Sequence, residues 1–330
     1  MIDRVLFLIE KYCDADPACG PTNAESMVVG ALESTGLVGQ LKHFYYDVLA
    51  KTFGQETINR MLLEDCDLFR PQAIVYTPMM GLLGVQLNPS KDTLKELRHR
   101  GIKIYTHLWD TCGREREMVD WFHDVSDAIG DVASNADRFH DPKFIQVWSA
   151  VDPRVFYDRK LNRDIDISFI GSVDLTGKKW PQRVAYINAL RNSGINVVVR
   201  GGQRGDRVSW EEYAKLLCRS KISLNFSMNI PTPHCQIKGR VFESMACGTM
   251  LLEDNGDMTR RFFEPGVDFV MFDCGWKGDQ LRFDDLLNKV KYYLAHEDER
   301  LKIAKSGREK VTTKYSAQSM WEYILRSTCG

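Results

Sequence analysis

Two basic residues and one acidic residue lie close together in the segment KGRVFESMACGTMLLEDN, residues 238–255. Lys238 and Arg240 fall in the first turn of a predicted helix, and Glu243 follows one turn later. Cations at a helix N-terminus oppose the helix dipole, which costs roughly 0.3–1 kcal/mol, and a bound anion would remove that conflict. A carboxylate can accept hydrogen bonds from both vicinal hydroxyls of a ribose. The three residues are therefore suited to binding a nucleoside diphosphate.

An alternative explains Glu243 without a ligand. It could form an i, i+3 ion pair with Arg240, which contributes only tenths of a kcal/mol in water. We expect Glu243 to lie on a different face of the helix from its apolar stripe. That stripe is expected to pack in the core and comprises Val241, Phe242, Met245 and Ala246.

Two loops that follow apolar runs offer further anion contacts. In FIGSVDLTGKKWPQR, residues 169–183, Ser172 and Arg183 bracket a glycine-containing loop, whereas Lys178 and Lys179 are more simply solvated surface residues. Arg200 directly follows the run VVV and precedes two glycines, so a nucleobase could lie there against exposed backbone. A surface loop followed by a helix that Ser209 caps explains the Arg200 region equally well.

The first half of the chain offers one candidate for acid–base chemistry. The segment IYTHLWDTCG, residues 104–113, ends a predicted strand and places Asp110 in the following loop. Asp110 could orient or deprotonate an acceptor hydroxyl, and a helix-capping role is the competing interpretation. His107 and His234 are expected to be hydrogen-bonded structural groups.

Short apolar runs alternate with helical patterns along the whole chain, and this alternation must position these residues. The runs of the first half are 5–10, 73–77 and 102–109, and those of the second are 165–173, 195–202, 222–227, 249–254 and 268–272. Strand–helix alternation predicts right-handed βαβ units and parallel sheets covered on both faces. Loops at the carboxyl ends of such strands are where ligands collect.

The pattern restarts after a Pro-containing, charged segment, which predicts two domains. We place an N-terminal Rossmann-like domain at residues 1–150 and a C-terminal one at 151–315, facing each other across a cleft. The last helix, 316–330, is expected to pack back towards the N-terminal domain.

Composition excludes several classes of protein. The formal net charge is −1, which disfavours nucleic-acid binding, and no apolar run approaches the ~20 residues of a transmembrane helix. The chain starts without a secretory signal pattern, and its nine cysteines are scattered and odd in number. A cytoplasmic enzyme with reduced thiols is the interpretation.

Residues 238–272 and 291–311 resemble the C-terminal half of group 1 glycosyltransferases of the GT-B fold, and the resemblance covers roughly residues 165–325. Within that group it is closest to the branch of spore-maturation-protein glycosyltransferases. It rests on the order of the Gly-Ser loop, Arg183, Lys-x-Arg-x-Phe-Glu, Ala-Cys-Gly and Phe-Glu-Pro-Gly. The first half resembles the family only in layout, with a loop at Gly20 and WSAVDPRVF in the interdomain position.

The resemblance implies a hexosyltransferase that binds a UDP- or GDP-sugar in its C-terminal domain and an acceptor on its N-terminal side. Glu243 matches the second glutamate of the family's Glu-x7-Glu motif, which holds the donor ribose. The first glutamate is replaced by Cys235, so the identity of the sugar stays open. The resemblance also implies transfer without a metal or other cofactor, with retention of the anomeric configuration.

The donor-binding residues expected from these arguments are Ser172, Arg183, Arg200, Lys238, Arg240 and Glu243, with Asp110 as the catalytic candidate. The acceptor is a glycan, a lipid-linked molecule, a protein or a small molecule. Two alternatives remain: a nucleotide-sugar epimerase or phosphorylase of the same fold, and a non-catalytic subunit that binds a glycan or nucleotide.

Overall fold

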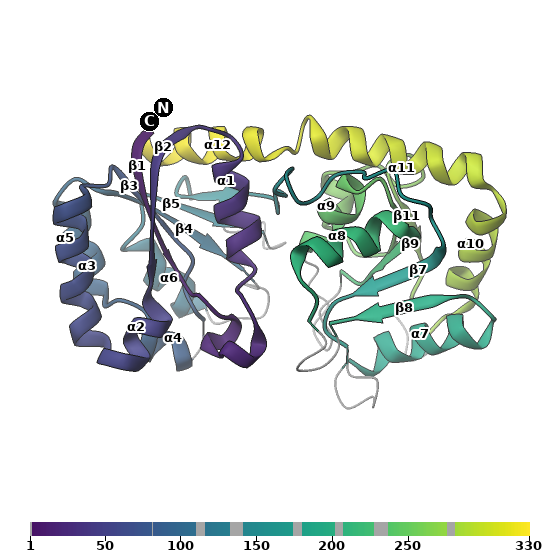
Figure 1. The fold of residues 1–330 in the computed structure, drawn as a ribbon, viewed down its shortest axis with the longest axis horizontal. Helices are drawn as coiled ribbons and strands as arrows, with labels where there is room; N and C mark the ends of the chain where they lie inside the picture. The colour runs from purple at the N-terminus through teal and green to yellow at the C-terminus, as the bar shows by residue number, and fades with distance from the viewer. Residues whose placement is uncertain are drawn as a thin grey trace. The chain divides into compact units, whose positions relative to one another are not determined.

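The computed structural model describes residues 2–80, 82–109, 116–132, 141–173, 180–201, 207–227, 237–275 and 281–330, without the side chains of 82, 83 and 116–119. Its contacts divide the chain into two compact units. The first comprises Met1–Asp152 and Ala317–Gly330, and the second comprises Pro153–Ser316. Each unit is built on one parallel β-sheet (Figure 1).

The sheet of the first unit has the strand order β2-β1-β3-β4-β5-β6. The strands are β1 (Ile2–Ile9), β2 (Val38–Tyr45), β3 (Ala73–Tyr76), β4 (Lys103–Leu108), β5 (Ala128–Asp131) and β6 (Phe144–Gln146). A π-helical segment (Glu25–Gly30) leads into α1 (Ala31–Glu33). The other helices are α2 (Tyr46–Phe53), α3 (Gln55–Phe69), α4 (Leu82–Leu87), α5 (Lys91–His99), α6 (Arg116–His123) and α12 (Ala317–Cys329).

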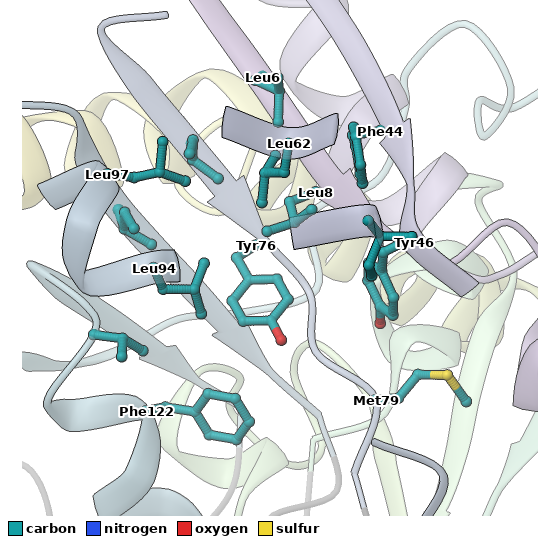
Figure 2. Close-up of a cluster of buried hydrophobic side chains, with 14 of the residues drawn as sticks. Leu6, Leu8, Phe44, Tyr46, Leu62, Tyr76, Met79, Leu94, Leu97 and Phe122 are labelled. Carbon is teal, nitrogen blue, oxygen red and sulfur yellow. The ribbon is translucent and has the colours of Figure 1, made fainter. Parts of the chain in front are cut away.

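Both faces of this sheet are buried. Side chains alternate along a strand, so Leu6 and Leu8 of β1 share one face and Phe7 points to the other, and all three are fully buried. Figure 2 shows Leu6 and Leu8 within a cluster that also takes in side chains of α2, α3 and α5. On β4, the Tyr105 ring contacts Trp321 of α12 edge-on at 6.0 Å. The C-terminal helix is thus part of the first unit's core.

The sequence predicted three strands in this unit, and β1, β3 and β4 confirm them. It missed β2, β5 and β6. Strand β2 lies at the sheet edge and has one buried residue, so it lacks the apolar run that marks a central strand. Strands β5 and β6 have the sequences AIGD and FIQ, so each combines short length with only two apolar residues in a row.

The second unit contains the sheet β11-β10-β9-β7-β8. Its strands are β7 (Ile165–Ile170), β8 (Val197–Arg200), β9 (Ser220–Asn225), β10 (Met250–Asp254) and β11 (Val270–Phe272). Its helices are α7 (Pro181–Asn192), α8 (Trp210–Arg219), α9 (Gly239–Ala246), α10 (Asp284–Ala295) and α11 (Glu297–Thr312). Every strand that the sequence predicted here is present, and Ser209 caps α8 as expected by accepting a hydrogen bond from the Glu212 amide at 3.2 Å.

The two sheets share one doubly wound order. When the strands of each unit are renumbered in chain order, both sheets read 2-1-3-4-5, with β6 added in the first unit. The chain changes direction across the sheet between β1 and β3 and again between β7 and β9. Crevices at the carboxyl ends of such switch-point strands are the usual ligand sites of this architecture. The predicted fold class of two parallel-sheet α/β units is confirmed.

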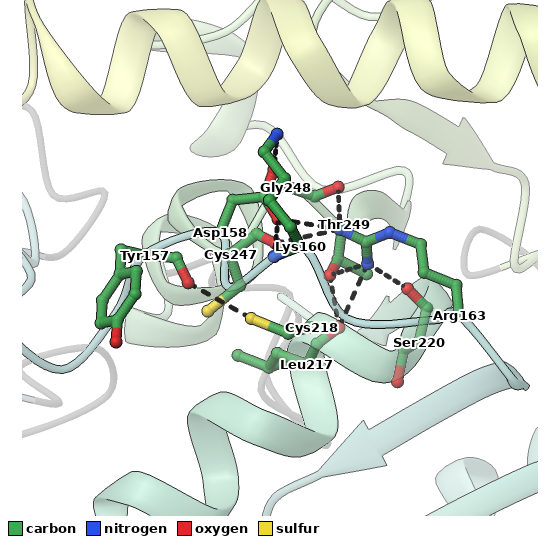
Figure 3. A network of polar contacts seen from close by, with 10 residues as sticks. All are labelled: Tyr157, Asp158, Lys160, Arg163, Leu217, Cys218, Ser220, Cys247, Gly248 and Thr249. Atoms are coloured by element: carbon green, nitrogen blue, oxygen red, sulfur yellow. Dashed lines mark hydrogen bonds and ion pairs between the residues drawn. The ribbon is translucent and has the colours of Figure 1, made fainter.

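Arg163 ties together the C-terminal ends of two helices in the second unit (Figure 3). Its guanidinium donates to carbonyls at the ends of α8 and α9 and to one hydroxyl; these acceptors are Leu217, Ser220, Cys247, Gly248 and Thr249. Helix C-termini carry unpaired carbonyls and partial negative charge, which a cation satisfies. Burial lowers the pKa of Arg163.

The described cysteines form no disulfide with one another. Among the described residues, no helix combines the length and apolar character needed to cross a bilayer.

We predict that Arg163→Met lowers the free energy of unfolding by about 3 kcal/mol, because it leaves several buried carbonyls without a donor. Urea denaturation followed by circular dichroism measures the change. Arg219→Met, which removes an exposed ion pair with Asp164, is the matched control and should leave the midpoint unchanged. Equal midpoints for the two variants would contradict the role of Arg163.

Candidate functional site

Arg240 spans the switch point of the second sheet. From the first turn of α9, its Nε donates to the Ile170 carbonyl at the end of β7, and its Nη1 donates to Asn225 Oδ1 at the end of β9. The guanidinium also lies over the Phe169 ring, 4.8 Å from the centroid. Three contacts thus fix a cation at the carboxyl ends of the two strands where the topology favours a ligand.

Gly171 makes this position of Arg240 possible. A Cβ on Gly171 would lie 1.9 Å from Arg240 Nη2, so a larger residue would displace the guanidinium. The Gly171 amide donates to the Arg200 carbonyl at 2.9 Å, which joins the ends of β7 and β8. The glycine of the Gly-Ser loop therefore serves close packing against the cation.

Ser172 and Arg183, which bracket the loop, are in contact through the Ser172 backbone. Arg183 Nη1 donates to the Ser172 carbonyl at 2.8 Å, and its guanidinium lies over the Trp180 ring, 4.2 Å from the centroid. Arg183 lies in the first turn of α7, which begins at Pro181. Lys178 and Lys179 lie outside the described residues.

The two remaining cations differ in their surroundings. Arg200 ends β8 with an exposed side chain whose Nη1 donates to the Val199 carbonyl at 2.9 Å. Lys238 is the half-buried N-cap residue of α9, and its carbonyl accepts from the Val241 amide at 3.0 Å. Backbone contacts at residues 170–172 thus connect Arg183, Arg200 and Arg240, while Lys238 begins the same helix turn as Arg240.

Glu243 is buried, with 4% of its surface exposed, and its Oε2 accepts a hydrogen bond of 2.5 Å from the Tyr213 hydroxyl of α8. The apolar stripe of α9 is buried as expected. Glu243 and Ser244 are buried as well, so α9 is enclosed on all sides and has no polar face. The partner of Glu243 is Tyr213, and Arg240 extends to the strand ends instead. Among the described residues, no donor contacts Glu243 Oε1.

Burial raises the pKa of Glu243, and the Tyr213 hydroxyl and the nearby Arg240 cation oppose that rise. Desolvation of a carboxylate is costly unless donors compensate it. The arrangement therefore holds one carboxyl group in a fixed orientation beside a cationic strand edge.

Two polar residues that the sequence analysis did not single out complete the arrangement. Asn225 and Glu253 are cross-strand partners on β9 and β10, and Asn225 Nδ2 donates to Glu253 Oε1 at 2.5 Å. Glu253 is fully buried, and burial, with the neighbouring Asp254 charge, raises its pKa to about 8. The signal available was a polar residue near the end of each apolar run, in ISLNFS and TMLLED.

In the first unit, His107 is buried and its Nδ1 lies 2.8 Å from the Tyr105 hydroxyl. Burial lowers its pKa to about 3, so the imidazole is neutral at physiological pH. Asp110, the catalytic candidate, lies outside the described residues, as do His234 and Cys235.

We predict that Tyr213→Phe lowers the free energy of unfolding by about 1–3 kcal/mol, because it removes a hydrogen bond to a buried carboxyl group. Thermal denaturation at pH 7 measures the effect. Tyr292→Phe, which removes a tyrosine–glutamate hydrogen bond on the surface, should leave the melting temperature unchanged. A Tyr213→Phe variant as stable as Tyr292→Phe would show that the buried contact contributes nothing.

Comparison with protein-family models gives a match over residues 156–326 to the family described as glycosyl transferase-like. The matched segment contains β7 to β11 and all the residues described above around Arg240, from Gly171 to Glu253. Comparison with curated protein sequences gives no significant match.

Comparison with solved structures shows GT-B glycosyltransferases with the same fold. HepE from Anabaena in complex with UDP has a TM-score of 0.63 at 11% identity, covering 98% of this chain and 99% of that one. A HepE complex with UDP-glucose also scores 0.63 at 11% identity, with 98% of each chain covered. Sucrose-phosphate synthase from Thermosynechococcus elongatus scores 0.56 at 13% identity, covering 98% of this chain and 96% of that one. The two sheets are thus those of the GT-B fold.

Proposed function

This chain belongs to the glycosyl transferase-like family, and we propose that it transfers a sugar from a nucleoside diphosphate sugar to an acceptor hydroxyl. The observation that carries the proposal is the anchored Arg240 guanidinium at the β7–β9 switch point, with a buried carboxyl group one helical turn away. The UDP and UDP-glucose complexes of HepE, which has the same fold, support a uridine nucleotide as the first ligand to test.

In this proposal the diphosphate lies at the N-terminus of α9. The first amides of a helix lack intrahelical partners and carry partial positive charge, so they donate to phosphate oxygens. Arg240 uses Nε and Nη1 for the protein, which leaves Nη2 for the ligand. Lys238 and Arg183 add positive charge, Ser172 adds a donor for the phosphate, and Arg200 borders the base. Cations and helix amides then perform the charge compensation that a metal ion performs elsewhere.

Glu243 is assigned to the ribose. The Tyr213 hydroxyl occupies Oε2 and fixes the rotamer, so that Oε1 accepts a hydrogen bond from a ribose hydroxyl. A preoriented acceptor costs little side-chain entropy on binding. Tyr213 thus acts as the residue that positions Glu243.

Transfer breaks the bond between the sugar C1 and the β-phosphate oxygen and forms a bond between C1 and the acceptor oxygen. The acceptor proton passes to the departing phosphate oxygen, so retention of configuration needs no protein nucleophile. We assign Asp110 the orientation of the acceptor hydroxyl. The acceptor classes remain a glycan, a lipid-linked molecule, a protein or a small molecule, and the transferred sugar is a hexose.

We predict that Arg240→Ala and Glu243→Ala each weaken UDP binding by one to two orders of magnitude, as expected for loss of a charge-assisted hydrogen bond of ~1.5–3 kcal/mol. Isothermal titration calorimetry with UDP and GDP measures the affinities. Arg219→Ala and Glu309→Ala, which remove exposed side chains of the same unit, are the matched controls and should bind as the unchanged protein does. Unchanged affinity in both site variants would argue against the assignment.

We predict that the chain slowly hydrolyses a nucleotide-sugar donor in the absence of acceptor and that a productive acceptor accelerates donor turnover. Chromatography of the donor and its products measures both reactions. An isomerised donor without transfer would instead identify an epimerase. Phosphate-dependent cleavage of a glycan would identify a phosphorylase, and binding without any turnover would identify a non-catalytic subunit.

A further inference from the structure

Asn225 connects Arg240 to the carboxyl group of Glu253, which has no contact with the donor in the proposed function. Its Oδ1 accepts from Arg240 Nη1 while its Nδ2 donates to Glu253 Oε1 at 2.5 Å. The register pairs Asn225 with Glu253, so both side chains leave the same face of the sheet. The amide group can therefore satisfy both neighbours in one orientation only, with its oxygen on the cation.

We propose that Glu253 is a positioning residue of the donor site, which holds the Asn225 amide on Arg240 from within the core and so fixes the guanidinium where the diphosphate can use its charge. This inference rests on the proposed function. Glu253 has no exposed surface, so it acts through Arg240 and does not contact the nucleotide.

The surroundings of Glu253 favour its neutral form. Complete burial and the adjacent Asp254 raise the pKa of Glu253 to about 8, against smaller opposing effects of Thr259, Asn225 and Arg240. Neither Glu253 Oε2 nor Thr259 Oγ1 has a hydrogen-bond partner among the described residues. A hydrogen bond between these two oxygens would satisfy both, whichever of them carries the proton, so the neutral form is favoured by burial and by Asp254 and not by Thr259.

Strand β11 places no charge opposite Glu253. On β11, the cross-strand partner of Glu253 is the uncharged Met271. α11 also packs against β10. The cations that α11 buries wholly or in part are Arg300, Arg308 and Lys310, of which Arg300 and Lys310 pair with Glu297 and Asp268.

Ionisation of Glu253 has two consequences of known sign. Above a pH of about 8, Glu253 carries a negative charge, and only the Asn225 side chain separates it from Arg240. This charge offsets the attraction of Arg240 for an anion, so nucleotide affinity falls. In the unfolded chain the pKa of Glu253 has the ordinary value of glutamate, which is lower than its pKa in the folded chain. The folded state therefore binds more protons between these two values, and its stability falls as pH rises from about 4.5 to about 8.

The experiment measures the dissociation constant of UDP at pH 7 and pH 9 for the unchanged protein and for Glu253→Gln. Glutamine cannot ionise. The dissociation constant at pH 9 divided by that at pH 7 should therefore be about fivefold larger for the unchanged protein than for the variant. The titration of UDP itself is common to both proteins and cancels in this comparison. The exposed Glu309→Gln is the control and should show the ratio of the unchanged protein.

Thermal denaturation between pH 5 and 9 provides a second readout. The melting temperature of the unchanged protein should fall relative to that of Glu253→Gln across this range. If Glu253→Gln does not fold, Glu253→Met, which has a similar length and no charge, replaces it in both measurements.

Equal pH ratios in the unchanged protein and the variant, with UDP binding intact, would overturn this inference and leave the proposed function standing. A shift in the melting profile without a difference in the pH ratios would overturn it too, because Glu253 would then ionise without acting on the site. An unchanged protein that binds neither UDP nor GDP at pH 7 would overturn both proposals.

Discussion

The second unit depends on one anchored cation. Arg240 donates to a backbone carbonyl at the end of β7 and to Asn225 at the end of β9, and it lies over the Phe169 ring. Such a group costs desolvation energy, which hydrogen bonds to Nε and Nη1 partly offset. Gly171 must lack a side chain for the guanidinium to fit. The strand order, Gly171 and the start of α9 together therefore determine where this positive charge lies.

The acids around this cation follow from the same constraint. Glu243 and Glu253 are buried on neighbouring elements, where two free carboxylates would neutralise Arg240 or destabilise the core. Each is supplied with one neutral donor, Tyr213 or Asn225, and burial raises the pKa of both. Positive charge is thereby kept at the strand edge, where an anion can use it. On the opposite side of the fold, Arg163 satisfies the carbonyls that end α8 and α9.

Strands with continuous apolar runs could be predicted because burial on both faces demands such runs. This holds for β7 to β11, and for β1, β3 and β4. The edge strand β2 was missed because its faces are only partly covered, and β5 and β6 were missed because each has only two consecutive apolar residues. The burial of Glu243 also ran against expectation: α9 is enclosed by the sheet, α8 and α11, so its polar residues are internal.

The amino-acid sequence by itself determined the α/β class, the doubling of the sheet and the grouping of Lys238, Arg240 and Glu243 on one short helix, because periodicity and spacing are local properties of the chain. Only the tertiary structure decided that Glu243 pairs with Tyr213 and that Arg240 reaches Asn225 and, through it, Glu253. Those partners are separated by 15 to 30 residues and meet because parallel strands align their carboxyl ends. Register and burial are properties of the assembled sheet. They determine which charged side chains are buried with a partner and which remain at the carboxyl ends of the strands.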